Sequence, residues 1–462
     1  MKRIRHIISV LMLLVILTVQ VPGQASTTLT MESGSDDQTS VALSQYQKDT
    51  KVKVLIDSFA SSKKTLLDML YSRNAKFDIY RPNTNQDTFQ AVKQKGYYVD
   101  LAGNAAIASF TKELLPVMQQ VVVQDDQIVA VPTGFTLPYA FSVNSRLLSE
   151  MGLSKDDLPK NMMELFDWID AWDETYGKQF PDVVPFFSSV RTERYNNPMM
   201  QLVLEMYRDY ALSTLGELNY DTQEFRQLME RIAAYQEEAV DHGDNWMADY
   251  PQQHNTVIYC QSVHANGIFH SYEHQWIAPL SLMRDAPAIQ PFYVKCAFVN
   301  PYSTHIEDAV TLLSYYASMP NDKLRCAISV SLAAPLEDEA FQGDFERAMA
   351  TKANAEEMLL SDELSVEQRE EYEWNLSIAD EYITNAERYR YVISPSSLEN
   401  YQKVILPYLF ARGMNAYESD GVLDQLTSFI TRYVDGELPL EQCIKQMNNT
   451  IKAMVLESGE TP

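Results

Sequence analysis

Polar and aromatic side chains stand at positions in this sequence where they could hold a ligand that carries hydroxyl groups. Planar polar side chains pair with hydroxyls, and flat aromatic rings stack on the apolar faces of ring-shaped molecules. The polar candidates follow predicted strands and are Ser35, Asp36, Arg81 and Asn83. The aromatic candidates are Tyr139, Tyr195, Trp246, Trp276 and Tyr302. We predict that these residues line a ligand-binding cleft.

Several of these residues also have a plainer interpretation as core or surface residues. Any single aromatic ring is more often part of a hydrophobic core, and we assign Trp168 and Trp172 to the core because they share one helical stripe. Trp246 stands in a polar stretch, which favours the cleft, whereas Trp276 fits either place. Arg81 is equally consistent with a surface turn. Two further arginines, which face either a cleft or surface acids, are Arg191 and Arg194.

Histidine spacing raises the question of a metal site. His270 and His274 are four residues apart, which would place two imidazoles on one helix face, and Glu273 lies between them. However, the chain has no HExxH motif, and Gly267 disfavours a helix here. We therefore predict that these residues are polar surface or cleft lining, and that the protein needs no metal or other cofactor.

Sequence motifs of common enzymes are absent from the chain. It has no GxSxG element, no Walker phosphate loop and no kinase motif set. Glycoside hydrolysis needs two carboxylates that are about 5 Å or about 6.5–9.5 Å apart. Because the chain has 63 Asp and Glu residues, some pair of them would always look suitable, so their number is no evidence for a glycoside hydrolase. We predict that the protein is not an enzyme, and a secreted glycoside hydrolase remains the alternative.

Composition describes a folded, strongly acidic protein. The 462 residues are 46% hydrophobic and 22% charged, which excludes wholesale disorder and is enough for two or three domains. The net charge of −26 argues against nucleic acid and against anionic lipid as partners. An acidic chain with 27 tyrosines favours a neutral polar or cationic ligand over an anionic one.

The first 25 residues have the layout of a secretory signal peptide. Lys2, Arg3 and Arg5 form a basic start, and Ile7–Val21 is almost entirely apolar. Small residues stand at the −3 and −1 positions of a cut after Ala25. The apolar run is shorter than the roughly 20 residues of a membrane span, so we favour cleavage over an uncleaved anchor. We therefore predict a soluble protein outside the cytoplasm.

Cysteine positions exclude several kinds of site. The first cysteine of the chain is far from the signal peptide, so no lipidated N-terminal cysteine is expected. CxxC spacing is also missing, which excludes zinc ribbons and thioredoxin-like motifs. In an oxidising compartment two disulfides could form, and four buried free thiols are equally consistent. The four residues are Cys260, Cys296, Cys326 and Cys443.

Hydrophobic periodicity predicts that the mature chain opens with a β-α-β-α-β unit. Its elements are a strand at 28–32, a helix at 40–48, a strand at 51–59, a helix at 61–72 and a strand at 77–80. Such a unit forms a parallel sheet with right-handed crossovers. Ligands of these sheets lie beyond the carboxyl ends of the strands. Here those ends are residues 33–36 and 81–85.

Later segments indicate further helices and one unusual insertion. Residues 124–127 predict a hairpin turn, 132–134 a break, and 139–144 a strand. Asn161 is a helix cap candidate, and 306–317 reads as a helix. Residues 337–390 are strongly acidic, lack proline and contain one glycine, so we predict a helical hairpin with its break at 361–365. Three helices close the chain, at 397–409, 423–434 and 440–456.

Several short segments occur in the order that one large family shows. Residues 76–80 (KFDIY) stand where that family ends its third strand with Asp and Ile or Val. Val131-Pro132 followed by 139–144 (YAFSVN) is similar to its Val-Pro and Tyr-Tyr-Asn stretch. Residues 147–168 are similar to the next stretch of that family, which is a helix followed by Gly-Leu and then by Pro-Lys-Thr-Trp-Asp-Glu-Leu. Residues 299–309 resemble the segment in which the family chain crosses between its lobes for the second time. The chain resembles the extracellular solute-binding proteins of ABC importers, in the carbohydrate-binding group (family 1) related to maltose-binding protein.

This resemblance implies a two-lobed α/β periplasmic-binding-protein fold, type II-like, with extra C-terminal helices. Lobe one would comprise 26–135 and 297–335, lobe two 136–296 and 391–462, and the insertion 336–390. Strands would cross between the lobes, which close on the ligand by hinge bending. The implied function is capture of a carbohydrate, in particular an oligosaccharide, by a monomer that delivers it to ABC permease subunits. A peptide or a polyamine remains an alternative ligand.

Two features depart from the family pattern. Its Gram-positive members usually carry a lipidated cysteine directly after the signal peptide, and this chain has none. In addition, the first strand begins almost at the cleavage position. How the protein is held at the cell surface, which sugar it binds and what the insertion does stay open at the level of sequence.

Overall fold

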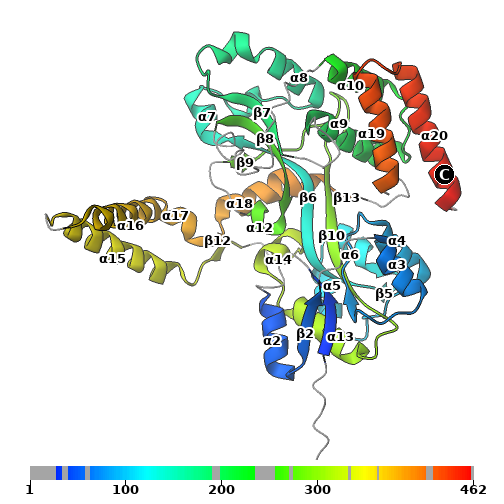
Figure 1. Cartoon of the computed structure of the whole chain (residues 1–462), viewed down its shortest axis with the longest axis horizontal. Coiled ribbons are helices and arrows are strands. Elements are labelled where there is room, and N and C mark those ends of the chain that lie inside the picture. The colour runs from blue at the N-terminus through cyan, green and yellow to red at the C-terminus, as the bar shows by residue number, and fades with distance from the viewer. Residues whose placement is uncertain are drawn as a thin grey trace, which may run out of the picture.

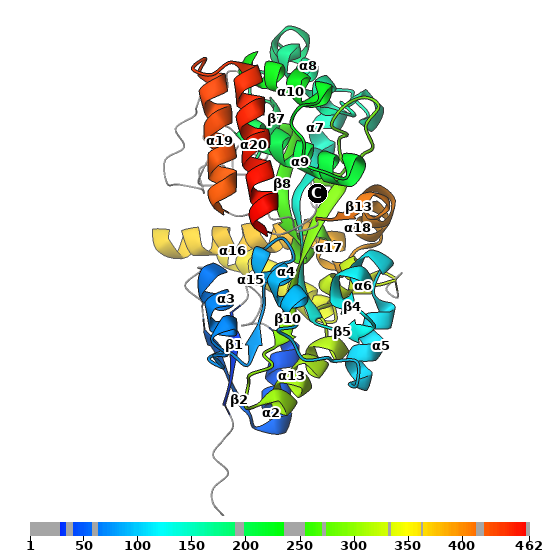
Figure 2. The same ribbon diagram turned by 90° about the vertical axis from the view of Figure 1, so that its right-hand side faces the viewer.

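The structure is a computed structural model. It describes residues 28–458 except 34–39, 58–62, 190–197, 235–254, 270–273, 331–333, 362–363 and 413–419. The described chain forms two α/β lobes, one above the other, and a pair of helices that projects sideways as an arm (Figure 1, Figure 2).

The lower lobe begins with the predicted β-α-β-α-β unit. Its elements are β1 (Thr28–Glu32), α2 (Val41–Thr50), β2 (Lys53–Asp57), α3 (Lys63–Tyr71) and β3 (Ile79–Tyr80). β1 pairs in parallel with both β2 and β3, which confirms the predicted parallel sheet. Ser40 starts α2 by accepting a hydrogen bond from the amide of Leu43 at 3.3 Å, as N-cap residues do. The carboxyl ends of β1 and β3 therefore lie at one edge.

One sheet continues from the lower lobe into the upper lobe, in the strand order β2-β1-β3-β10-β6-β8-β7. β6 (Val131–Asn144) pairs with β10 (Gln290–Val299) along its first half and with β8 (Thr256–His264) along its second half. On β6, Phe135 belongs to the lower hydrophobic core and Phe141 to the upper one. The remaining strands of this sheet are β7 (Val184–Ser188), β9 (His274–Trp276) and β13 (Leu409–Ala411).

The predicted break at 132–134 is wrong, because β6 runs unbroken through it. Proline has no amide N–H and is tolerated in sheets mainly at edges and bulges. The partner strand β10 has a register irregularity between Lys295 and Cys296, opposite Pro132. The Cys296 amide donates to the carbonyl of Pro82 at 3.1 Å. This local irregularity accommodates the proline without ending the strand.

The hairpin turn that the sequence predicts at 124–127 is present in the lower lobe. β4 (Val123–Gln124) and β5 (Gln127–Ile128) form the predicted hairpin. Asp125 and Asp126 have φ angles of 48° and 63°, the positive values that two-residue hairpin turns need. Other helices that cover this lobe include α4 (Asp87–Lys95), α5 (Ala105–Glu113), α6 (Pro116–Val122), α12 (Ala265–Ile268), α13 (Ile306–Ser318) and α14 (Asp322–Ile328).

The upper lobe is built around a second core, to which Trp172 contributes a buried ring, as predicted. Asn161 caps α8 by accepting a hydrogen bond from the amide of Glu164 at 3.0 Å, which confirms the predicted cap. The helices of this lobe are α7 (Ser145–Glu150), α8 (Met162–Asp170), α9 (Pro198–Tyr210), α10 (Gln223–Ala234), α19 (Asp420–Val434) and α20 (Leu440–Ser458).

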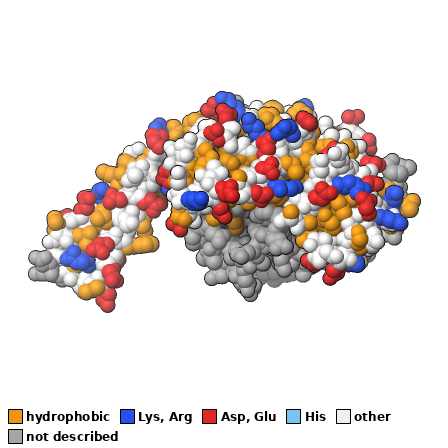
Figure 3. Space-filling view, turned by 90° about the horizontal axis from the view of Figure 1, so that it is seen from above, with side chains coloured by type: hydrophobic (Ala, Val, Ile, Leu, Met, Phe, Trp, Pro, Cys, Tyr) orange, Lys and Arg blue, Asp and Glu red, His pale blue; other side chains and the backbone are white. Residues whose placement is uncertain are grey.

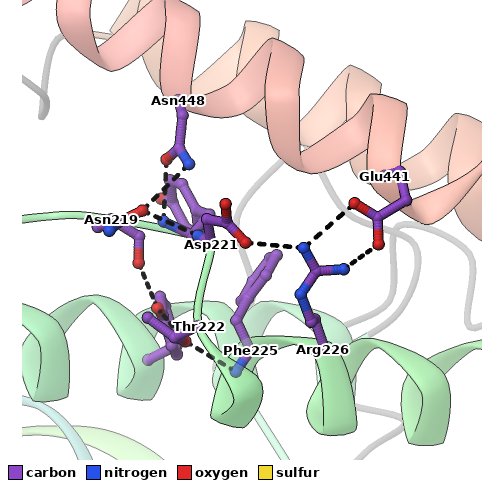
Figure 4. A network of polar contacts seen from close by, with 9 residues as sticks. Asn219, Asp221, Thr222, Phe225, Arg226, Glu441 and Asn448 are labelled. Atoms are coloured by element: carbon purple, nitrogen blue, oxygen red, sulfur yellow. Dashed lines mark hydrogen bonds and ion pairs between the residues drawn. The ribbon is translucent and has the colours of Figure 1, made fainter.

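The C-terminal helix α20 is fastened to the upper lobe by polar contacts (Figure 4). Arg226 on α10 forms ion pairs with Glu441 and, at 2.7 Å, with Asp221. The side chain of Asn448 donates to the side-chain oxygen of Asn219 at 3.1 Å. Beneath these contacts, Cys443 and other apolar residues of α20 are buried in the upper core. The last helices therefore belong to this lobe.

The acidic insertion forms the projecting arm. α15 (Phe341–Leu359) and α16 (Val366–Thr384) pack against each other, and the short helix α17 (Ala386–Tyr389) follows them. β11 (Leu336–Glu337) pairs with β12 (Tyr391–Ile393) at the base. The helical hairpin predicted from composition is therefore present, and Ser365 caps its second helix. In the view of Figure 3 the arm carries interspersed acidic and apolar side chains.

The helix predicted at 397–409 is present between the arm and α19, but only its start is a regular α-helix. α18 (Pro395–Asn400) continues as one turn of π-helix (Tyr401–Ile405) and one turn of 3-10 helix (Leu406–Tyr408) into β13, and Pro407 in the last turn has no amide N–H for an α-helical hydrogen bond. Tyr401 and Ile405 pack in the lower core, although the resemblance places 391–462 in lobe two. β13 pairs with β10, so the chain returns to the upper lobe beside the crossing strands. The lobe boundaries themselves stay a prediction.

The four cysteines are buried free thiols, which selects one of the two alternatives left open by the sequence. Within the part of the chain that the structure describes, no helix combines the length and the apolar character needed to cross a bilayer.

Candidate ligand site

A cavity of about 500 Å³ lies where the lower lobe meets the crossing strands. Its walls come from the end of β3, from β6, β8 and β10, from the start of α2 and from the segment that joins α13 to α14. The cavity therefore lies beyond the carboxyl end of β3, where ligands of such sheets bind. Its charged and hydrogen-bonding side chains include Arg81, Asn83, His264, Tyr293, Lys295 and Arg325.

One row of side chains on the crossing strands forms the first half of the cavity floor. Thr136 on β6 pairs with Tyr293 on β10 and with His264 on β8. Paired residues of neighbouring strands point to the same face, so all three line the cavity. The Thr136 hydroxyl lies 2.7 Å from Nδ1 of His264. Burial raises the pKa of Tyr293 above the ordinary tyrosine value, which already lies well above neutral pH.

A second row runs beside the first. Lys295 on β10 pairs with Gly134 on β6, and Asn83 bridges to Lys295 from the other side. A Cβ atom at position 134 would lie 3.2 Å from the Cβ of Lys295, so glycine leaves room here. The Lys295 Nζ donates to the carbonyl of Ser33, at the carboxyl end of β1, at 3.3 Å. Lys295 thus lies on the floor between Gly134 and Asn83.

Arg81 connects the end of the parallel sheet with this floor. It is 3% exposed, and its Nε donates to the hydroxyl of Thr133 at 3.2 Å. The Arg81 amide donates to the carboxylate of Glu32, the last residue of β1, at 2.5 Å. The Thr133 hydroxyl in turn donates to the carbonyl of Lys295 at 3.3 Å. These contacts join the guanidinium through Thr133 to the backbone of β10, and the burial of Arg81 excludes its interpretation as a surface turn residue.

The rim of the cavity carries both positively and negatively charged side chains. Arg325 on α14 forms an ion pair with Glu113 at 2.7 Å, and Asp322 is exposed. Tyr316 on α13 adds a half-buried aromatic ring to the wall. With hydrogen-bond donors on the floor and aromatic rings beside them, the cavity suits a polar ligand that has flat apolar faces.

Of the nine predicted site residues, Arg81 and Asn83 line this cavity. Tyr139 and Trp276 are buried elsewhere, with exposed fractions of 1% and 4%. The Tyr139 hydroxyl donates to Asp209 at 3.0 Å. The Trp276 indole donates to the carbonyl of Ile268 at 2.8 Å. Both rings pack in the hydrophobic cores, and their polar atoms are paired there.

Tyr302 lies at the opposite edge of the lower sheet. It follows β10, which is antiparallel to β3 and ends beside Ile79, where β3 begins. Its ring contacts Tyr97, with centroids 6.3 Å apart, and the guanidinium of Arg73 lies 6.0 Å from its centroid. Tyr302 is not among the residues that line the cavity.

The remaining candidates lie outside the described residues. This group comprises Ser35, Asp36, Tyr195 and Trp246, the arginines Arg191 and Arg194, and His270 and Glu273 of the histidine-rich segment. Among the residues that the structure does describe, no group of three or more His, Cys, Asp or Glu side chains is arranged to hold a metal.

Sequence reasoning missed Tyr293, Lys295, Thr136 and His264. A signal for the first two exists in β10. Within the otherwise apolar strand QPFYVKCAFV, Tyr293 and Lys295 are two residues apart, and both are half-buried. Alternate residues of a strand share a face. Two polar side chains at this spacing therefore mark a face that opens onto a cavity instead of a core.

Comparison with known proteins gives a match in structure. No protein-family model matches the sequence, and no curated protein sequence matches it either. The maltose-bound MalE3 of T. maritima is similar with a TM-score of 0.55 and 14% identity, over 93% of this chain and 100% of that one. An ABC transporter solute-binding protein of Thermotoga lettingae, bound with α-D-tagatose, has a TM-score of 0.54 and 15% identity, over 93% and 100%.

A third similar structure is an ABC substrate-binding protein of Listeria monocytogenes in complex with cycloalternan. Its TM-score is 0.53 and its identity 12%, over 94% of this chain and 99% of that one. These matches span nearly the whole chain at low identity, so they establish the fold. The protein has the two-lobed α/β fold of ABC solute-binding proteins, as the sequence resemblance predicts.

Proposed function

We propose that the protein captures a carbohydrate, in particular an oligosaccharide, between its two lobes and delivers it to the permease subunits of an ABC transporter. The observation that carries this proposal is the position of the cavity. Its floor consists of β6, β8 and β10, and two of these strands, β6 and β8, carry residues of both hydrophobic cores. Bending at these strands would move the lobes relative to the cavity, as in hinge closure around a ligand.

The chemistry of the lining supports a sugar as the ligand. Arg81, Asn83 and Lys295 offer hydrogen-bond donors, and Tyr293 and Tyr316 offer rings beside them. Three proteins of the same fold are described as bound to maltose, tagatose and cycloalternan. In this proposal the protein is a monomer outside the cytoplasm that changes no bond in its ligand. Residues 1–25 serve as its signal peptide, without a lipidated cysteine after them.

The first experiment is a thermal-shift screen of residues 26–462 with mono- and oligosaccharides, peptides, polyamines and divalent metals. A ligand at 100 times its dissociation constant stabilises the folded state by about 2.7 kcal/mol, which gives a readable rise in melting temperature. We expect a rise with a sugar, and small-angle scattering should show a smaller radius of gyration when that sugar is bound. The sugar should be recovered chemically intact.

A pair of matched variants tests whether the sugar binds in this cavity. Arg81→Gln should weaken sugar binding, whereas Arg146→Gln removes the same charge from an exposed pair with Glu150 and should leave binding unchanged. A rise in melting temperature with only peptides, polyamines or metals would reject the carbohydrate. Recovery of a cleaved sugar would replace the transport receptor with a hydrolase.

A further inference from the structure

We propose that the arm docks a positively charged protein segment along one exposed face of α16. Five residues make up this face, which we call the α16 stripe: Glu367, Glu371, Trp374, Ile378 and Glu381. The proposal concerns a surface outside the cavity and does not depend on which ligand the cavity binds. It gives a role to the acidic insertion, whose described residues between 341 and 389 belong to neither main core.

The spacing of these residues places them on one side of the helix. They follow one another at intervals of four, three, four and three positions, which is the repeat of a single α-helical face. The stripe runs along most of α16, and all five side chains are exposed. Ala379, the buried residue of α16, is not part of the repeat. The stripe therefore faces solvent, although α16 packs against α15 along another side.

Trp374 and Ile378 form the apolar centre of the stripe. They lie one turn apart, with exposed fractions of 67% and 49%, whereas Trp172 and Trp276 are both 4% exposed. Among the residues that the structure describes, none stacks on the Trp374 ring or accepts a hydrogen bond from its indole. Burial of apolar surface is favourable, and tryptophan is enriched among the residues that dominate binding at protein interfaces. This pair is therefore suited to anchor a partner.

Carboxylates stand on both sides of the apolar pair. Glu371 lies one turn before Trp374, Glu381 lies one turn after Ile378, and Glu367 lies a further turn before Glu371. Within the described part of the chain, no lysine or arginine pairs with these three carboxylates. The described cations of the arm are held elsewhere: Arg347 pairs with Asp344, Lys352 pairs with Glu356 and Asp380, and Arg369 donates to the carbonyl of Ser361.

This charge selects the class of partner. Residues 341–389 contain 13 acidic and four basic side chains, so the arm repels nucleic acid, anionic lipid and a second copy of itself. A protein segment that carries lysine or arginine around an apolar contact is complementary to the stripe in both charge and polarity. The arm projects sideways from the two lobes, so such a partner reaches it without entering the cavity (Figure 1).

The test uses a synthetic amphipathic peptide of leucine and lysine, with its leucines at helical spacing, and a counterpart in which glutamate replaces every lysine. The dissociation constant of each labelled peptide with the protein of residues 26–462 is measured by fluorescence anisotropy. The lysine peptide should bind, and the glutamate peptide should not. Because the interaction joins opposite charges at the surface, its affinity should fall as salt is raised.

Matched variants assign the binding to the stripe. Trp374→Ala removes the apolar anchor, and Glu367→Gln with Glu371→Gln removes two carboxylates; each change should raise the dissociation constant of the lysine peptide by about tenfold or more. The control is Glu346→Gln with Glu357→Gln, which removes the same charge from exposed positions on α15 and should change binding by less than about twofold. All these positions are exposed, so each variant should melt at the temperature of the parent protein.

Absence of binding by the lysine peptide, or equal losses in the two double variants, would overturn the proposal. A dimer, or binding to phosphatidylcholine vesicles, that Trp374→Ala abolishes would also overturn it, because the stripe would then serve a second copy or a membrane. Sugar binding should be the same in all these variants. Failure of this proposal and failure of the proposed function are therefore distinguishable.

Discussion

Arg412 and Asp209 form a buried bidentate ion pair although they are 203 positions apart in the chain. The Nε and Nη2 atoms of Arg412 donate to the two carboxylate oxygens of Asp209 at 2.9 and 2.6 Å. The same guanidinium lies 2.7 Å from Glu205, and Tyr139 donates to Asp209. Arg412 directly follows β13, which pairs with β10. The pair therefore ties the crossing strands to α9 in the upper lobe.

Arg412→Met should destabilise the protein strongly. Removing the arginine leaves the carboxylates of Asp209 and Glu205 without their shared cation in a buried site, which costs about 3–5 kcal/mol. Urea unfolding of the variant and the parent protein measures this difference. Lys403→Met, at an exposed ion pair, should cost less than about 1 kcal/mol. Equal stability of the two variants would contradict the structural role of the network.

The same network predicts a loss of stability in acid. Burial alone would raise the pKa of Glu205, but Arg208 and Arg412 outweigh it and hold the pKa below the ordinary value of 4.5. A depressed carboxyl pKa contributes stability that is fully present above 4.5 and is lost as pH falls through the folded value. Unfolding free energies between pH 6 and pH 3 should therefore decline below 4.5. The decline should be shallower in Arg412→Met, and an unchanged slope would argue against Glu205 as the cause.

Gly134→Val should weaken ligand binding more than it changes stability. A Cβ at this position lies 3.2 Å from the Cβ of Lys295 on the cavity floor, so the valine methyl groups would occupy ligand space. We expect a rise in the dissociation constant of at least about tenfold, measured by calorimetry with the best sugar of the screen. Gly103→Val, where nothing lies within 4 Å of the added Cβ, serves as the control and should bind normally.

Removal of the arm should leave ligand binding intact. Among its described residues between 341 and 389, the buried ones are Ala355 and Ala379, so the arm contributes little to either main core. At the base of the arm, the Asp338 amide donates to the carbonyl of Arg390 at 2.9 Å. Replacing 339–389 by Asn-Gly should preserve the sugar dissociation constant within twofold and the melting temperature within a few degrees. Loss of binding would show that the arm supports the cavity.

The cysteines should be unreactive in the folded protein. All four are buried free thiols, and burial raises the pKa of Cys326 and Cys443 to about 11. Thiols, unlike thiolates, react slowly, so a thiol reagent at neutral pH should label none of them before unfolding and all four afterwards. The melting temperature should also be the same with and without reductant. A drop with reductant would indicate a disulfide.

Local structure follows closely from the sequence. The opening β-α-β-α-β unit, the turn at Asp125 and Asp126, the cap at Asn161 and the helical hairpin all depend on residues within a few positions of one another. Caps, turns and hydrophobic periodicity act at this range, so they can be recognised without tertiary context. For the same reason the position of Arg81 and Asn83 directly after β3 could be predicted, and both line the cavity there, whereas their role in binding stays a prediction.

Tertiary structure decided the rest, because the remaining contacts join distant parts of the chain. Thr136 and His264 meet across 128 positions, and Tyr139 is buried by a partner 70 positions away. Whether an aromatic ring faces a cavity or a core depends on such pairings, which periodicity does not encode. The lining of the cavity is decided in the same way, because strand pairing placed Tyr293 and Lys295 of β10 against Thr136 and Gly134 of β6.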